Sequence, residues 1–178
     1  MYRWRIATES AVYLTELIAT DRTFVAPLLN DHDVSKNLLL VPHPYSEADF
    51  GEFYELTQAT TEQLGQPVHF AIRNEAGMMI GCFGVKDLVE GHCCKIGYWL
   101  GKPYWGYGMM THVVRAMTPY VIGQWGLVRV VAHTFRKNLA SARVLEKAGF
   151  EYEGLQKKLH KKHDQFIDAR VYSFVRDA

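Results

Sequence analysis

The sequence has few of the features that place a protein in an oxidising, membrane or nucleic-acid setting. Its 178 residues include only three cysteines, Cys82, Cys93 and Cys94, without a disulfide framework or zinc-ligand spacing. The formal net charge is +1, so no overall field attracts nucleic acid or an anionic membrane. No apolar run is long enough to span a bilayer, and the opening MYRWRIATES lacks the apolar centre of a signal peptide. We therefore expect a cytoplasmic protein with reduced thiols, no metal, and neither nucleic acid nor a membrane as partner.

Internal repeats and low-complexity linkers are also missing. Apolar residues make up 48% of the chain and charged residues 22%, which is ordinary for a globular protein. The length suits one domain with a substantial core, so we expect a single domain over residues 1–178. Nothing in the sequence indicates the oligomeric state.

Hydrophobic periodicity and breaker residues predict an α/β protein with one mixed (α+β) sheet. Ser46 with Asp49 forms a capping box, Thr20 or Asp21 and Asn138 are further N-caps, and Gly149 suits a C′ position. Pro119 predicts a kink or an early end in its helix. The expected strands are Val12–Ile18, Val68–Arg73, Met78–Val85, Cys93–Leu100, Leu127–Phe135, and a terminal hairpin of Glu151–Leu159 and Phe166–Val175 around KKHDQ. The expected helices cover Thr23–Leu29, Ser46 to Gly65, a segment from Met109, and Asn138 to Ala148-Gly149.

The stretch KPYWGYGMMTH, from Lys102 to His112, joins a predicted strand to a predicted helix. Its Gly106 and Gly108 allow a backbone approach to a phosphate at the unpaired N–H groups of the helix start. The alternative is that the two glycines only form a turn. The stretch lacks the third glycine of a dinucleotide fingerprint and the Gly-Lys-Ser/Thr of a Walker loop.

Five ordered motifs connect this loop to a known family. They are I-G-Y-W-L (Ile96–Leu100), Y-W-G-Y-G (Tyr104–Gly108), N-L-A-S (Asn138–Ser141), V-L-E-K-A-G-F (Val144–Phe150) and Y-E-G (Tyr152–Gly154). Together they resemble the GNAT acyl-CoA N-acyltransferases, and more closely their RimJ/RimL-like branch. The resemblance is dense from Lys95 to Gly154 and looser over the rest of the chain. It implies the GNAT-type fold, in which two central strands splay apart.

The resemblance implies an N-acetyltransferase with acetyl-CoA as co-substrate and a primary amine as acceptor, which attacks the thioester directly. A protein N-terminal α-amine is the acceptor that the branch suggests. A small amine, such as an antibiotic, polyamine or amino acid, is the alternative, and a non-catalytic CoA-binding domain is another. The residues implied to bind the cofactor are Tyr98, Trp99 and Leu100 on the strand, Trp105, Gly106, Tyr107, Gly108, Met109 and Met110 in the loop, and Asn138.

Two residues are candidates for proton transfer. Many relatives place a tyrosine where Leu145 stands, and in the RimJ/RimL-like branch a serine takes its role, which matches Ser141. A neutral amine is needed for attack, and His160 matches the position of the expected base. Asn138 and Ser141 could instead be only a helix cap and a first-turn serine. The alternative bases are His69, Glu90, His92, His133 and a water-relayed group.

Some positions depart from the family pattern. Pro103 and His112 replace the usual flanks of the loop, and Lys95 stands where relatives often carry a glutamate. The CoA 3′-phosphate could meet Lys102, Arg136, Lys137 or Arg143, and the acceptor site could involve His43, Tyr45 and the helix face Phe50–Tyr54.

Overall fold

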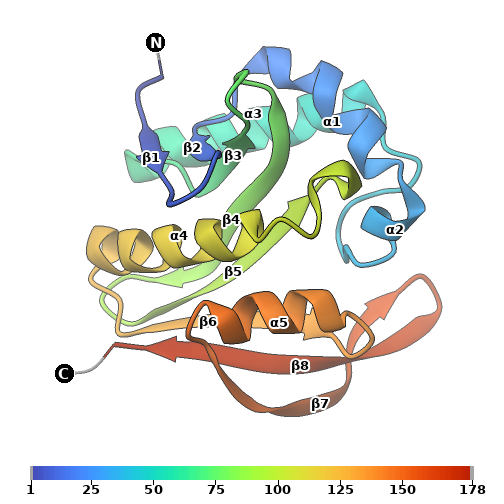
Figure 1. The fold of residues 1–178 in the computed structure, drawn as a ribbon, viewed down its shortest axis with the longest axis vertical. Helices are drawn as coiled ribbons and strands as arrows, with labels where there is room; N and C mark the ends of the chain where they lie inside the picture. The colour runs from blue at the N-terminus through green and yellow to red at the C-terminus, as the bar shows by residue number, and fades with distance from the viewer. Residues whose placement is uncertain (1, 177–178) are drawn as a thin grey trace. The chain divides into compact units, whose positions relative to one another are not determined.

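The structure is a computed structural model that describes residues 2–176 (Figure 1). The chain forms two compact units. The first holds the residues up to Gly84 together with Tyr98–Met109, and the second holds Val85–Gly97 together with the residues from Met110 onward. Eight strands hydrogen-bond in the order β1-β2-β3-β4-β5-β6-β8-β7, and β4 (Met79–Val89) and β5 (Cys93–Leu100) each run through both units. The predicted mixed sheet with helices is confirmed.

The first unit packs three helices with the first strands of the sheet. β1, β2 and β3 pair antiparallel, and β3 pairs antiparallel with the start of β4. Side chains such as Leu17, Val25, Leu29, Phe50 and Met79 form one buried cluster. The elements that complete this unit are β1 (Arg5–Ala7), β2 (Tyr13–Thr15), α1 (Arg22–Leu29), α2 (His32–Ser35), α3 (Glu47–Leu64), β3 (His69–Arg73) and the 3-10 turns Ala19–Asp21 and Lys102–Tyr104.

Both predicted ends of α3 are confirmed. The Ser46 hydroxyl accepts a hydrogen bond from the Asp49 N–H at 3.2 Å, and the Asp49 carboxylate accepts one from the Ser46 N–H at 2.7 Å. This reciprocal pair is the predicted capping box. Gly65 closes the helix at φ +71°, a left-handed conformation that favours glycine.

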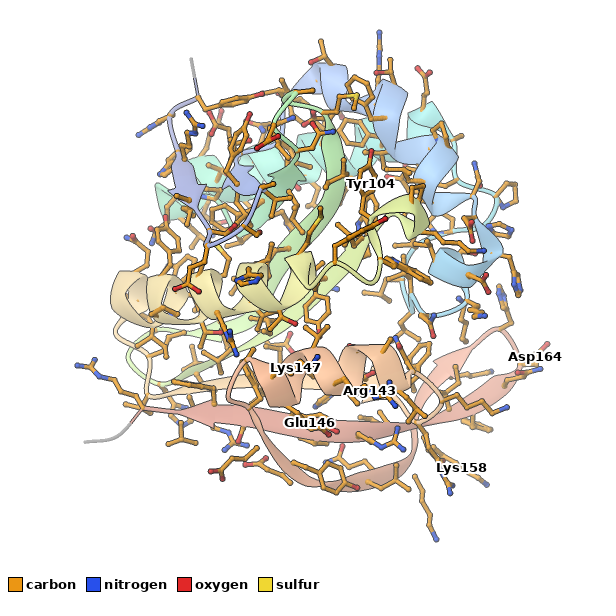
Figure 2. All side chains as sticks on the ribbon, in the orientation of Figure 1. Tyr104, Arg143, Glu146, Lys147, Lys158 and Asp164 are labelled. Carbon is orange, nitrogen blue, oxygen red and sulfur yellow. The ribbon has the colours of Figure 1, made fainter. Side chains whose placement is uncertain are left out.

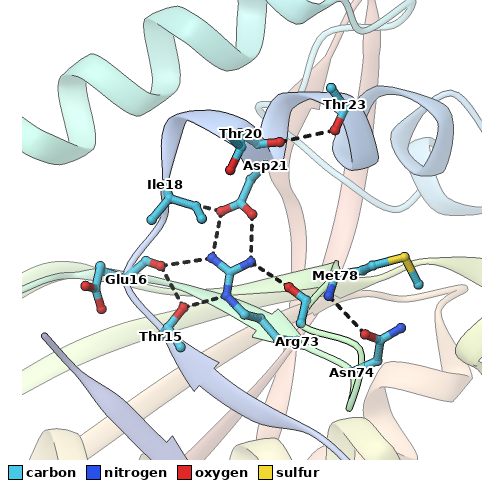
Figure 3. Close-up of polar contacts among 10 residues, drawn as sticks. Thr15, Glu16, Ile18, Thr20, Asp21, Thr23, Arg73, Asn74 and Met78 are labelled. Atoms are coloured by element: carbon cyan, nitrogen blue, oxygen red, sulfur yellow. Dashed lines mark hydrogen bonds and ion pairs between the residues drawn. The ribbon is translucent and has the colours of Figure 1, made fainter. Parts of the chain in front are cut away.

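The N-terminal prediction needs correction. The predicted strand Val12–Ile18 is limited to Tyr13–Thr15. β1 and α2 were not predicted, because both are too short to show a periodic pattern. Asp21 does not cap α1. Its carboxylate instead binds the Arg73 guanidinium at 2.7 and 2.9 Å, and both side chains are 1% exposed (Figure 3). A buried cation is a stronger partner for a carboxylate than a helix N–H, which explains the difference.

The second unit contains the parallel pair β5–β6 and the C-terminal hairpin. β6 (Arg129–Phe135) pairs antiparallel with β8 (Gln165–Val175), which pairs with β7 (Glu151–Lys162). Figure 1 shows α5 (Leu139–Lys147) lying over β6 and β8. Alternate residues of β6 are buried on the covered face, while Val131, His133 and Phe135 are half-buried on the opposite face.

The parallel ladder between β5 and β6 is short. It joins Cys93–Ile96 to Arg129–Ala132, although both strands continue, β5 to Leu100 and β6 to Phe135. Among the described residues the two strands therefore pair only over their first four positions. This limited pairing agrees with the splayed central strands that the sequence predicts.

Helix α4 (Met109–Trp125) continues through Pro119, so an early end at this proline was a wrong prediction. Proline removes one backbone donor and weakens the helix at that point. The apolar face of α4 offsets this loss, because Val113, Met117 and Val121 are all fully buried.

Helix α5 ends as predicted. Gly149 has φ +90° and its N–H donates to the Glu146 carbonyl at 3.1 Å, while the Phe150 N–H donates to the Leu145 carbonyl at 3.0 Å. These two bonds define a Schellman motif, and the buried Phe150 supplies its apolar contact.

The predicted terminal hairpin is confirmed, but its strands are longer than expected. The turn is at His163-Asp164, so His160 lies inside β7 and not at the hairpin tip. The register between β7 and β8 shifts twice, between Tyr152 and Gly154 and again between Gln156 and His160. Lys158 has φ +52°, and its N–H donates to the Asp168 carboxylate at 2.9 Å, which stabilises the second irregularity.

Candidate active site

The glycine loop of the first unit is an exposed segment between β5 and α4. Gly106 and Gly108 adopt φ values of +86° and +74°, so both positions require the left-handed region that side chains disfavour. A Cβ added at Gly106 would meet no protein atom within 4 Å. The loop therefore leaves open space beside the start of a helix, where unpaired N–H groups favour an anion.

The strand end before this loop is held firmly within the first unit. The Trp105 indole N–H donates to the Leu100 carbonyl at 2.7 Å, and the Gly101 N–H donates to the Ile80 carbonyl at 2.8 Å. A Cβ on Gly81 would lie 2.4 Å from the Trp99 carbonyl oxygen, so only glycine permits the close approach of β4 to β5.

Lys102 is engaged by an acidic pair. Its ammonium lies 2.7 Å from Asp33 and 3.9 Å from Asp31. The hydrogen bond to Asp33 and the charges of both carboxylates raise the pKa of Lys102. Among the predicted phosphate partners, Arg136 also has an acidic neighbour, Asp168, at 3.3 Å, and Figure 2 shows Arg143 on α5.

The asparagine–serine motif lies at the start of α5 in the second unit. The Asn138 side-chain oxygen accepts a hydrogen bond from the Ser141 N–H at 3.1 Å, so the predicted N-cap is confirmed. The Ser141 side chain is half-buried in the first turn. Leu145, which stands where relatives carry a tyrosine, is 1% exposed and belongs to the core.

His160 lies in a small aromatic group on the face of the sheet that α5 does not cover. Its ring centroid is 5.7 Å from that of His133 on β6 and 6.0 Å from that of Phe135. All three side chains are half-buried. The position inside β7 thus gives His160 a packed environment, unlike the solvated hairpin tip that its lysine-rich sequence suggests.

Burial and a nearby cation favour the neutral form of both histidines. Burial lowers the pKa of His160, and the charge of Lys95 on β5 lowers it further. Burial, Lys95 and His160 lower the pKa of His133, whereas Asp87 on β4 raises it. Neutral imidazole can accept a proton, so this group has the chemistry of a base near neutral pH.

The other candidate bases have different surroundings. His69 packs edge-on against Phe53 at 4.9 Å between ring centroids and lies 3.5 Å from the Thr57 hydroxyl. Glu90 and His92 are exposed in the turn between β4 and β5. His69 therefore has a packing role in the first unit, and His133 is the alternative base that the structure brings next to His160.

The candidate acceptor residues belong largely to the core. Tyr45 is 7% exposed, and burial raises the pKa of its hydroxyl to about 12. Phe50 is 2% exposed and stacks with Tyr54 at 6.1 Å between ring centroids. His43 is exposed.

The predicted site residues are distributed over both units. Tyr98, Trp99, Leu100, Trp105, Gly106, Tyr107, Gly108 and Met109 lie in the first, and Met110, Asn138, Ser141 and His160 lie in the second. One feature of the histidine group could not be found from the sequence: Lys95 and Asp87 form an ion pair at 2.9 Å, and Lys95 lowers the pKa of both histidines. The signal available was the lysine at a position where relatives often carry a carboxylate.

Two classes of site are not found in the described part of the chain. Within residues 2–176, no three His, Cys, Asp or Glu side chains are grouped as a metal site would require. Among the described helices, none combines the length and apolar character needed to cross a membrane.

Comparison with known proteins gives consistent matches. The probable N-acetyltransferase YjcK of Bacillus subtilis (strain 168) is 34% identical over 110 residues, covering 60% of this chain and 61% of that protein. The [ribosomal protein uS5]-alanine N-acetyltransferase of Escherichia coli (strain K12) is 31% identical over 81 residues, covering 44% of this chain and 42% of that protein. The chain spans 61% and 59% of the length of the first two curated relatives it matches.

Solved structures share the fold. RimL, a ribosomal L7/L12 alpha-N-protein acetyltransferase in complex with coenzyme A, superposes with a TM-score of 0.85 at 18% identity, covering 97% of this chain and 98% of that one. The model of the acetyltransferase (GNAT) domain matches residues 12–151, a range that includes residues of both units. The chain thus belongs to the GNAT acetyltransferase family.

Proposed function

We propose that this protein transfers the acetyl group of acetyl-CoA to a primary amine, and that the acceptor is the N-terminal α-amine of a protein or peptide. The observation that carries the proposal is the glycine loop, in which two left-handed glycines precede a helix start and Gly106 borders open space. The family membership gives this anion site its expected ligand, the pyrophosphate of CoA. We infer that both units belong to one N-acetyltransferase domain, because the family match includes residues of each.

The proposed cofactor contacts are mostly backbone groups. The N–H groups from Trp105 to Met110 would hold the pyrophosphate, and the backbone of Tyr98–Leu100 would pair with the pantetheine arm. The helix cap uses only the oxygen of Asn138, so its amide nitrogen can donate to the arm as well. Because Lys102 is already paired with Asp33, loop binding would depend on the backbone more than on a lysine.

The proposed chemistry uses one base and one acid. The neutral amine nitrogen forms a bond to the thioester carbonyl carbon, and His160 takes a proton from that nitrogen as the bond forms and later releases it to solvent. A backbone N–H of Tyr98–Leu100 stabilises the oxyanion. The carbon–sulfur bond then breaks, and the Ser141 hydroxyl gives a proton to the departing thiolate and regains one from solvent. No acyl-enzyme forms, so the three thiols have no role in the transfer.

Names of relatives support the choice of acceptor. Two relatives are named for protein acceptors. One is the uS5-alanine N-acetyltransferase, and the other is RimL, a ribosomal L7/L12 alpha-N-protein acetyltransferase. The test is thiol release from acetyl-CoA with a panel of N-terminal peptides and small amines. Peptides should be acetylated far faster than free amines. A wide preference for free amines would overturn the acceptor, and CoA binding without thiol release across the panel would overturn the activity.

A matched pair of variants tests the loop. Gly106→Asn places a side chain in the open space, and asparagine tolerates a positive φ better than most residues. Gly65→Asn is the control, because Gly65 also has a positive φ and open space but caps α3. Only Gly106→Asn should raise the KM for acetyl-CoA. Equal effects, or none, would remove the pyrophosphate from this loop.

A further inference from the structure

The ion pair of Lys95 and Asp87 borders the histidine group on the sheet face opposite α5. Lys95 Nζ lies 2.9 Å from the Asp87 carboxylate, and the two side chains are 47% and 66% exposed. In the parallel ladder Lys95 is opposite Val131, two residues before His133 on the same strand face. The lysine therefore projects from the face that carries the two imidazoles.

Titratable groups from three strands surround the histidines. β4 contributes Asp87, β5 contributes Lys95 and the half-buried Cys93, and β7 contributes Lys162 two residues after His160. On β8 the residues opposite His160 and His133 are the apolar Ile167 and Val171. Arg129, farther along β6, is bound by Glu153 through two hydrogen bonds.

We propose that Lys95 is a positioning residue that favours the neutral, proton-accepting forms of His160 and His133, and that Asp87, paired with Lys95, moderates this effect. A cation disfavours a second positive charge nearby, and the adjacent carboxylate reduces this effect. Two imidazoles in contact also disfavour each other's protonation. The role of the histidines as proton acceptors rests on the proposed function, but the effect of Lys95 on their titration can be measured without any enzymatic activity.

The arrangement also accounts for a departure in the sequence. The family resemblance implies a glutamate at this position in many relatives, whereas this chain carries Lys95 there. A cation lowers the pKa of a carboxyl group and of an imidazole alike. Near neutral pH a carboxylate is already ionised and only loses basicity, whereas an imidazole gains in its neutral, proton-accepting fraction. The exchange of charge at residue 95 is thus matched to a histidine base on β7.

The experiment compares variants whose effects have opposite signs. Lys95→Gln should raise the pKa values of His160 and His133, measured by NMR titration of their ring signals, and should move the acidic limb of kcat/KM to higher pH. Asp87→Asn should lower the pKa of His133, and asparagine suits the φ of +47° at this position. Lys95→Arg keeps the positive charge, so both histidines should titrate as they do in the unchanged protein.

The matched control is Lys147→Gln, which removes the same charge from an exposed position on α5 (Figure 2). It should leave both histidine titrations unchanged. The Lys95→Gln shift should also shrink at high salt, because the pair is exposed and ions screen it. Histidine titrations that do not move, or that move in the same direction in Lys95→Gln and Asp87→Asn, would overturn the inference. Titrations that move as expected in a protein that releases no thiol would support it and overturn only the proposed function.

Discussion

Replacing Asp21 by asparagine should remove more stability than any comparable change of a surface carboxylate. The Arg73 guanidinium is 1% exposed, and its nitrogens donate to Thr15 at 2.7 Å, to the Glu16 and Gly77 carbonyls at 3.3 and 3.2 Å, and to Asp21 twice (Figure 3). The Asp21 carboxylate supplies the only negative charge in this set. Its loss leaves a buried cation uncompensated.

The expected cost is about 3–5 kcal/mol, the range found when one partner of a buried ion pair is removed. For a protein of this size each kcal/mol lowers the melting temperature by roughly 2–4 °C, so the change should be roughly 6–20 °C. Urea denaturation followed by circular dichroism measures the free energy, and a thermal scan measures the melting temperature. The double variant Asp21→Leu with Arg73→Met should recover part of the loss, because it leaves no buried charge.

The control is Asp33→Asn, which removes an exposed carboxylate from the same unit. Asp33 pairs with Lys36 and Lys102, whose hydrogen bonds lower its pKa to about 2, but solvent screens these pairs. It should unfold at nearly the same urea concentration as the unchanged protein. If Asp21→Asn costs less than about 1 kcal/mol, or no more than Asp33→Asn, the reasoning on the buried pair is wrong.

Three further predictions concern the proposed chemistry. Ser141→Ala should lower kcat by about 10²-fold or more with little change in the KM for acetyl-CoA, and an unchanged kcat would exclude this hydroxyl as the acid. His160→Gln should flatten the acidic limb of the pH–rate profile. The limb of the unchanged protein should lie below the ordinary histidine pKa, because burial and Lys95 lower the pKa of His160 and activity requires the neutral ring. Alkylation at pH 8 followed by peptide mass spectrometry should label the half-buried Cys93 before Cys94, because burial raises the pKa of the Cys94 thiol to about 12. Labelling of Cys94 first would contradict its burial. Cys93→Ser should retain activity, since the proposed transfer uses no thiol.

Local signals predicted the parts of the fold that depend on neighbouring residues. The capping box at Ser46, the Schellman motif at Gly149 and the strand Cys93–Leu100 each follow from a few adjacent residues, and all three are confirmed. The role of Asp21 could not be predicted in this way. Its partner Arg73 is 52 residues away, and only the tertiary structure brings the two together.

The candidate site shows the same division. The glycines of the loop and the Asn138 cap could be located from spacing alone. The contact of His160 with His133, and the effect of Lys95 on both, depend on which strands are neighbours and on their register. No pattern within a single strand predicts these contacts, because β5, β6 and β7 are separate in the chain.

The irregular pairing of β7 has a consequence for how this chain can vary. From Tyr152 to Gly154, β7 advances two residues while β8 advances one, from Tyr172 to Val171. From Gln156 to His160, β7 advances four residues while β8 advances only two, from Ala169 to Ile167. The direction in which His160 points is therefore set by these extra residues and not by simple alternation. Loss of one residue between Gly154 and His160 would turn the imidazole to the other face of the sheet. Related chains that differ in length within β7 should be aligned so that residues on the same face of the strand correspond. An alignment that places the gap at the wrong residue would match His160 to a residue on the opposite face.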